Sequence, residues 1–150
     1  MIQIICPVDS FKHYEKPIIE FQKRLGKKVK LIKIKPSKKK EETEVKKEET
    51  ERLKQILEKT KGYKVLLCID GNSLNSIEFE RFLSEKQMNF SDITFVIGGA
   101  FGVDFEKIQD LIDYKFSFSK MTFPHSLALL TLYEQLYRAE SIKTGKKYHK

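Results

Sequence analysis

No stretch of this 150-residue sequence reaches the roughly 20 consecutive apolar residues that a membrane-spanning helix needs. The N-terminal segment reads MIQIICPVDS and lacks both the basic flank and the small-residue cleavage site of a secretory signal peptide. The chain also has no CxxC motif and no paired Cys/His spacing, which are the patterns of zinc sites. These absences predict a cytoplasmic protein with no membrane anchor and no metal.

Cysteine is rare, and the sequence has only Cys6 and Cys68, each inside an apolar run. Because no secretion signal is present, a disulfide bond between them is not expected. Both are predicted to be buried thiols in strands.

Two common phosphate-binding motifs, GxxxxGK(S/T) and GxGxxG, are also missing, which excludes a P-loop and a Rossmann fingerprint. The composition is nonetheless that of a folded protein, with 40% hydrophobic and 33% charged residues. Its length fits one domain covering residues 1–150.

Positive charge is concentrated at the start of the chain. Residues 1–40 contain twelve Lys or Arg and three acids, whereas residues 41–150 contain seventeen and eighteen. A second basic run occupies residues 138–150. The pattern predicts a polyanionic partner, above all RNA. The alternative is a general enrichment in lysine, which would distribute lysine along the whole chain.

Apolar periodicity predicts alternating strands and helices. The expected strands are 2–8, 29–35, 63–69, 93–97 and the start of 114–123. The expected helices are 14–25, 38–61, 75–87, 104–112 and 125–143. This order predicts an α/β fold with a mostly parallel sheet.

Local signals refine these boundaries. Residues 70–73 read as a turn, Ser76 as a helix cap and Pro124 as the opening of the last helix. In the charged helix, Val45, Glu49, Leu53, Ile56 and Leu57 form one stripe. We expect its other faces to be solvated, with RNA contact as the alternative and a mobile segment at 38–48.

A pair of glycines, Gly98 and Gly99, follows the apolar strand 93–97 directly. Ligands of open α/β sheets bind beyond the carboxyl ends of the strands, and glycine lets a ligand approach the backbone. The alternative is a purely structural turn. The segment FSFSKMTFPH (116–125) is the second candidate, because an extended chain presents amides and carbonyls that can read an adenine edge.

Four segments in a fixed order resemble the RlmH family of SPOUT-class methyltransferases: FVIGG (95–99), SFSKMTFPH (117–125), EQLYRA (134–139) and YHK (148–150). The resemblance covers essentially the whole chain. It implies a SPOUT-type α/β fold with a C-terminal trefoil knot and a homodimer. It also implies that S-adenosyl-L-methionine is the methyl donor, and that the acceptor is N3 of a pseudouridine in 23S ribosomal RNA on the assembled ribosome.

The same resemblance assigns the site residues. Donor binding falls to Leu67, Gly98, Gly99, Phe118, Ser119, Lys120, Met121, Thr122 and Phe123. Catalytic roles fall to Arg138 of EQLYRA and to Tyr148 and His149, which lie in a tail that reaches the partner's pocket. His149 is either a base or a contact to the target, or else part of a solvated tail. Arg138 either binds phosphate or pairs with Glu134, and His125 orders the loop.

The last helix is apolar on nearly all sides over its first half, as Leu127, Leu130, Tyr133 and Leu136 illustrate. Such a helix must be covered from several directions. A partner subunit would supply one cover, and deep burial within a single chain is the alternative.

Several positions depart from the family pattern. Cys68 stands where an acid is usual, Asn72 where lysine is common, and Leu129 where arginine is usual. The early Val-Gly-Lys is replaced by Val8-Asp9-Ser10. These departures keep two alternatives open: a ribosome- or RNA-binding relative with weak or no activity, and a SPOUT enzyme with another RNA target.

Overall fold

The computed structural model describes residues 1–150 and contains one five-stranded sheet of order β2-β1-β4-β3-β5. Every pair of neighbouring strands is parallel, which confirms the α/β prediction. The strands are β1 (Ile2–Pro7), β2 (Val29–Ile34), β3 (Tyr63–Ser73), β4 (Ile93–Val96) and β5 (Tyr114–Ser117).

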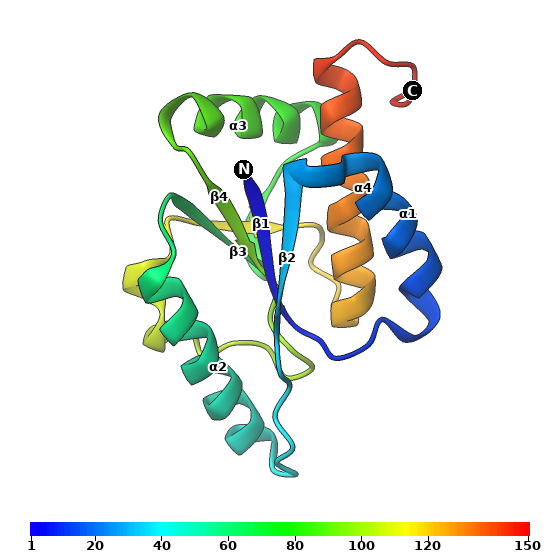
Figure 1. The fold of residues 1–150 in the computed structure, drawn as a ribbon. Helices are drawn as coiled ribbons and strands as arrows, with labels where there is room; N and C mark the ends of the chain where they lie inside the picture. Colours follow the sequence, from blue (N-terminus) through cyan, green and yellow to red (C-terminus); the bar gives the residue numbers. More distant parts are fainter.

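Helices cover both faces of the sheet (Figure 1). The helices are α1 (Glu15–Leu25), α2 (Glu42–Lys59), α3 (Ser76–Asn89) and α4 (His125–Lys143). Helices α1, α3 and α4 pack together on one face. Helix α2 and two short 3-10 turns, Phe105–Lys107 and Gln109–Leu111, cover the other.

Alternating side chains of the central strands build a core on each face. Ile4 and Cys6 of β1 join the larger core beneath α1, α3 and α4, whereas Ile5 joins the smaller core beneath α2. The chain leaves β1 toward one edge of the sheet and leaves β4 toward the other. Neighbouring strands whose connections diverge in this way leave a crevice at their carboxyl ends.

Four local predictions are wrong. Residues 70–73 are not a turn but continue β3, because its pairing with β5 resumes at Asn72 and Ser73 after an irregularity. Asn75, not Ser76, caps α3. Helix α2 begins at Glu42 and not at residue 38. The helix expected at 104–112 is a pair of 3-10 turns.

None of the helices combines the length and the apolar character needed to span a membrane.

Candidate functional site

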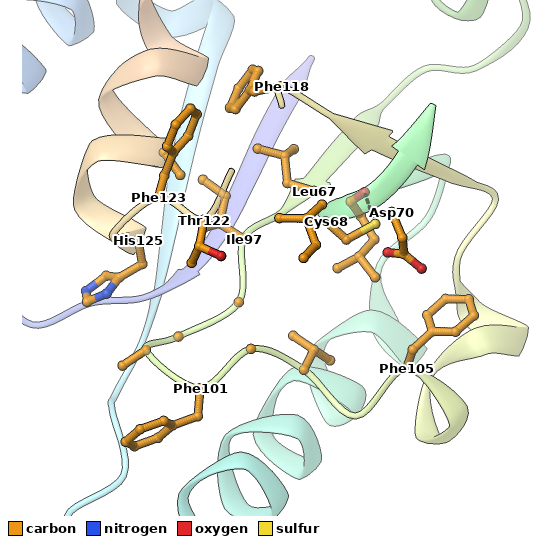
Figure 2. A pocket seen from close by; sticks show the side chains of 18 of the residues that line it. Leu67, Cys68, Asp70, Ile97, Phe101, Phe105, Phe118, Thr122, Phe123 and His125 are labelled. Carbon is orange, nitrogen blue, oxygen red and sulfur yellow. Dashed lines mark hydrogen bonds between the residues drawn. The ribbon is translucent and has the colours of Figure 1, made fainter. Parts of the chain in front are cut away.

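A cavity of about 630 Å³ opens at the carboxyl ends of β3 and β4. Its size lies within the range of roughly 300–1,000 Å³ typical of small-molecule sites. Three segments form its walls: the end of β3 (66–70), the loop after β4 (97–103) and the loop from β5 to the first turn of α4 (118–128) (Figure 2). Both segments singled out from the sequence therefore contribute to one cavity.

The loop after β4, residues 98–104, is called the glycine loop below. Gly99 and Gly102 pair across a tight turn, with the Gly102 N–H donating to the Gly99 oxygen at 3.0 Å. Gly102 has φ +76°, which favours glycine. A Cβ on Gly98 would lie 2.9 Å from Val103 Cγ2, and one on Gly99 would lie 2.2 Å from Glu49 Oε1. A side chain at either position would therefore have to displace the end of a neighbouring side chain, so glycine leaves room for Val103 and Glu49 independently of any ligand.

Aromatic side chains form the wall on the β5 side. The Phe118 ring lies 5.3 Å from the Phe116 ring and 6.4 Å from the Phe123 ring, measured between centroids. Ser117 Oγ is 2.9 Å from the carbonyl oxygen of Ser119, whose own hydroxyl accepts the Met121 N–H at 3.1 Å. These short-range contacts hold the loop after β5 in a compact turn, which presents backbone to the cavity.

The end of β3 and strand β5 carry the only ion pair among the residues that line the cavity, between Asp70 and Lys115 at 2.8 Å. The Lys115 ammonium also lies 4.3 Å from the centre of the Phe105 ring. The hydrogen bond from Lys115 lowers the pKa of the exposed Asp70 carboxyl. Burial, and secondarily Asp70, raise the pKa of the Cys68 thiol to about 11. The family's usual acid is missing at position 68, but a carboxylate two residues later reaches the same cavity.

His125, the first residue of α4, lies at the edge of the cavity (Figure 2). It is half-buried, and burial is the main cause that lowers its pKa. His125 therefore lines the site as a neutral imidazole at neutral pH.

The structure brings together eight of the nine residues assigned to donor binding. The cavity is lined by Leu67, Gly98, Gly99, Phe118, Ser119, Met121, Thr122 and Phe123. Lys120 is exposed and is not among the lining residues.

The three residues assigned to catalysis form a separate cluster. Arg138 belongs to the second half of α4, and Tyr148 and His149 follow the helix and pack beside it. Arg138 pairs with Glu134 and lies 3.2 Å from His149 Nδ1. The Tyr148 hydroxyl donates to Glu134 at 3.1 Å, and its ring packs against Tyr137. Of the two roles considered for Arg138, the structure shows the pairing with Glu134.

This cluster does not meet the cavity within one chain. The cavity reaches α4 at Ala128, ten residues before Arg138. At 1.5 Å per residue, the two sites are about 15 Å apart along the helix axis. Figure 1 shows the C-terminus beyond the far end of α4.

Sequence reasoning missed several lining residues, notably Asp70, Phe105 and Lys115. Asp70 is missing from the predicted site because the sequence pattern predicts a turn at residues 70–73. The period of two along a strand could have found it, because residue 70 shares a face with residue 68. Phe105 and Lys115 carried no signal, since only the folded chain brings them to this edge.

A comparison with known families matches residues 1–149 to the profile described as "Predicted SPOUT methyltransferase". The chain belongs to the SPOUT methyltransferase family. This membership confirms the resemblance seen in the sequence, and with it the SPOUT class of the α/β fold.

Similar SPOUT proteins are found in several bacteria, and each is named Ribosomal RNA large subunit methyltransferase H. The chain is 39% identical to that of Clostridioides difficile over 147 residues, covering 93% of this chain and 92% of the relative. It is 37% identical to that of Caldicellulosiruptor saccharolyticus over 156 aligned positions, covering all of both chains. It is 38% identical to that of Fusobacterium nucleatum over 154 positions, covering 99% of each.

Proposed function

We propose that this chain transfers a methyl group from S-adenosylmethionine to N3 of a pseudouridine in 23S ribosomal RNA of the assembled ribosome, acting in the cytoplasm as a homodimer of single-domain subunits. The observation that carries the proposal is the cavity built from Leu67, the glycine loop and the loop after β5. Relatives of matching length that are named for large-subunit rRNA methylation support the choice of substrate.

The residues around the cavity fit a bent adenosyl donor. More than half of the lining residues are hydrophobic, which suits a purine ring and a thioether chain. The two loops supply backbone N–H and C=O groups for the polar edge of the base. Asp70 offers an acceptor for ribose hydroxyls or for the donor's ammonium group.

S-adenosylmethionine, when bound, supplies an electrophilic methyl group on a sulfonium ion, so the protein's task is to position and desolvate. Leu67, Phe118 and Phe123 exclude water from the cavity, and the glycine loop sets its depth. The methyl acceptor must approach from the open side, where Phe101 and Met121 are exposed.

The homodimer follows from the separation of the two clusters. Within one chain, Arg138 lies about 15 Å from Ala128 along α4. Tyr148 and His149 pack beside Glu134 and Arg138, and a second copy would bring this cluster to the cavity. Half-buried apolar residues on α4, such as Leu127 and Leu130, offer the contact surface.

The geometry of the tail favours a specific role for His149. Arg138 can only donate, so His149 Nδ1 must accept and the proton of the neutral ring resides on Nε2. In this arrangement His149 presents an N–H donor, suited to a uracil carbonyl and not to abstraction of the N3 proton. We therefore propose that His149 orients the target base.

An RNA partner is supported by unpaired positive charge. Lys38, Lys39 and Lys40, in the connection between β2 and α2, are exposed and form no ion pair. Such side chains suit phosphate contacts, which give affinity without reading sequence.

Two measurements test the proposal. Calorimetry with S-adenosylmethionine and S-adenosylhomocysteine should detect binding to the purified chain. Mass spectrometry of 23S rRNA from a strain lacking the gene should show one N3-methylpseudouridine missing, and restoring the gene should restore it. An unchanged modification pattern would remove the substrate assignment, even if the donor binds.

A second candidate is a ribosome-binding relative without activity, favoured by Cys68 and Leu129 at positions where the family pattern has charged residues. Leu129 of α4 is fully buried in the larger hydrophobic core. Ribosome binding combined with no donor binding at millimolar concentration would favour this candidate.

A further inference from the structure

A buried carboxylate lies directly behind the glycine loop. Glu49 of α2 is only 6% exposed, although it belongs to a helix rich in solvated charges. Its Oε2 accepts the Ser37 N–H at 3.0 Å. Its Oε1 is inaccessible to solvent and has no hydrogen-bond partner.

Glu49 Oε1 is also the atom that excludes a side chain at position 99, since a Cβ there would lie 2.2 Å from it. The next residue of α2, Thr50, accepts the Asp104 N–H at 3.0 Å through its hydroxyl. Adjacent α2 side chains thus contact the glycine loop near its start and at its end. The same helix holds the chain after β2, because Arg52 donates to the Lys35 carbonyl at 2.6 Å.

An unpaired buried acceptor is costly, and a carboxylate oxygen more so than a neutral one. Glu49 Oε1 is covered by protein, so a molecule in the cavity cannot reach it directly. The nearest cavity-lining backbone is that of the glycine loop at Gly99. A small shift of this loop would bring one of its N–H groups to the free oxygen.

We propose that Glu49 is a positioning residue for the donor cavity. Its carboxylate supports the glycine loop from behind, and Oε1 accepts a loop N–H in the donor-bound state. This inference rests on the proposed function for the identity of the ligand. The contact between Glu49 and Gly99 does not depend on that function.

The first test changes the charge without changing the shape. In Glu49→Gln, one oxygen can still accept the Ser37 N–H, which turns the amide NH₂ toward Gly99 and removes the acceptor there. We expect binding of S-adenosylmethionine to weaken about tenfold, the worth of one charged hydrogen bond. The donor KM should rise accordingly, while kcat on ribosomes stays within about threefold. Glu51→Gln, an exposed neighbour with the same change in charge, is the matched control and should bind normally.

The second test measures the contact itself through thermal unfolding, without any ligand. Gly99→Ala should lower the Tm by about 4 °C or more, because Glu49 must give up its bond to Ser37 or the loop must move. In a Glu49→Ala background the same substitution should cost much less, since the space is vacant.

The outcomes are separable. Normal donor binding by Glu49→Gln overturns the positioning role, and additive Tm changes in the double variant overturn the contact. If the wild-type chain binds no donor, the proposed function fails and the donor role of Glu49 fails with it. The unfolding cycle would still decide whether Glu49 supports Gly99.

Discussion

At the scale of single residues, burial controls the chemistry of the thiols. Cys6 is fully buried in β1, and burial, with the nearby negative charge of Glu49 second, raises the pKa of its thiol to about 12. Cys68 at the cavity is half-buried, with a pKa raised to about 11. Both thiols are therefore protonated and weakly nucleophilic at neutral pH.

The Cys6 thiol makes stability depend on pH under alkaline conditions. The folded chain holds the thiol proton more tightly than the unfolded chain, whose thiol ionises near pH 8.5. The stabilisation is therefore complete below about pH 8.5 and is lost as pH rises toward about 12. We expect Cys6→Ala to have a shallower loss of unfolding free energy over pH 9–11, by at most about 1.4 kcal/mol per pH unit. Urea unfolding across this range measures it, and parallel profiles for both proteins would contradict it.

Gly71 offers a test of backbone packing. A Cβ at this position would lie 2.7 Å from the Phe116 backbone, where β3 passes β5. Gly71→Ala should lower the unfolding free energy by about 1–3 kcal/mol and should weaken donor binding, because residues 66–70 would move. Gly26→Ala is the control: φ is +56° but nothing lies within 4 Å of the new Cβ. It should cost about 1–3 kcal/mol through backbone strain alone and leave donor binding unchanged. Equal binding defects in both variants would argue against the packing explanation.

At the scale of elements, α2 and α3 serve different purposes. Helix α2 buries Val45, Leu53 and Leu57 against the sheet and uses Glu49 and Thr50 of the same side to contact the glycine loop. Helix α3 begins with a capping box, in which Asn75 and Glu78 each accept the other's backbone N–H, at 2.8 and 2.7 Å. This cap sets where the extended end of β3 turns back over the sheet.

The cap makes a prediction about α3. Asn75→Ala should lower the unfolding free energy by about 1 kcal/mol, because the Glu78 N–H loses its side-chain acceptor. Ser76→Ala is the comparison, since Ser76 donates to Gln135 at 2.7 Å but does not cap the helix. Its cost should be smaller. Chemical denaturation of the two variants decides between the caps, and the reverse ranking would favour Ser76.

At the scale of the whole molecule, α4 separates the cavity from the cluster of Arg138, Tyr148 and His149. Its first turn closes the cavity, and its second half carries Arg138 with Tyr148 and His149 packed beside it. In the proposed homodimer, the cavity of one subunit and the tail of its partner form a single site.

Removal of residues 148–150 should separate binding from turnover. We expect donor affinity to stay within about twofold, because the tail does not line the cavity, while methylation of ribosomes falls by about two orders of magnitude through lost positioning.

Mixed dimers provide the control. The truncated chain should regain activity when mixed with Gly98→Val, in which a side chain would collide with Val103. In the mixed dimer one intact cavity meets one intact tail. Failure to complement, or a monomeric protein in light scattering, would contradict a shared site.

Strand and helix periodicity, Pro124 and the run of motifs were enough to predict the parallel α/β fold, its family and most of the cavity wall. These features are local. Leu67, the glycine pair and residues 118–123 can be recognised from the residues next to them in the sequence. Only the tertiary structure decided that residues 70–73 extend β3, that Glu49 and Val103 pack against the glycine pair, and that Asp70 and Lys115 pair beside Cys68. Each of these depends on contacts between residues distant in sequence, which burial and hydrogen bonding select only once the sheet has assembled.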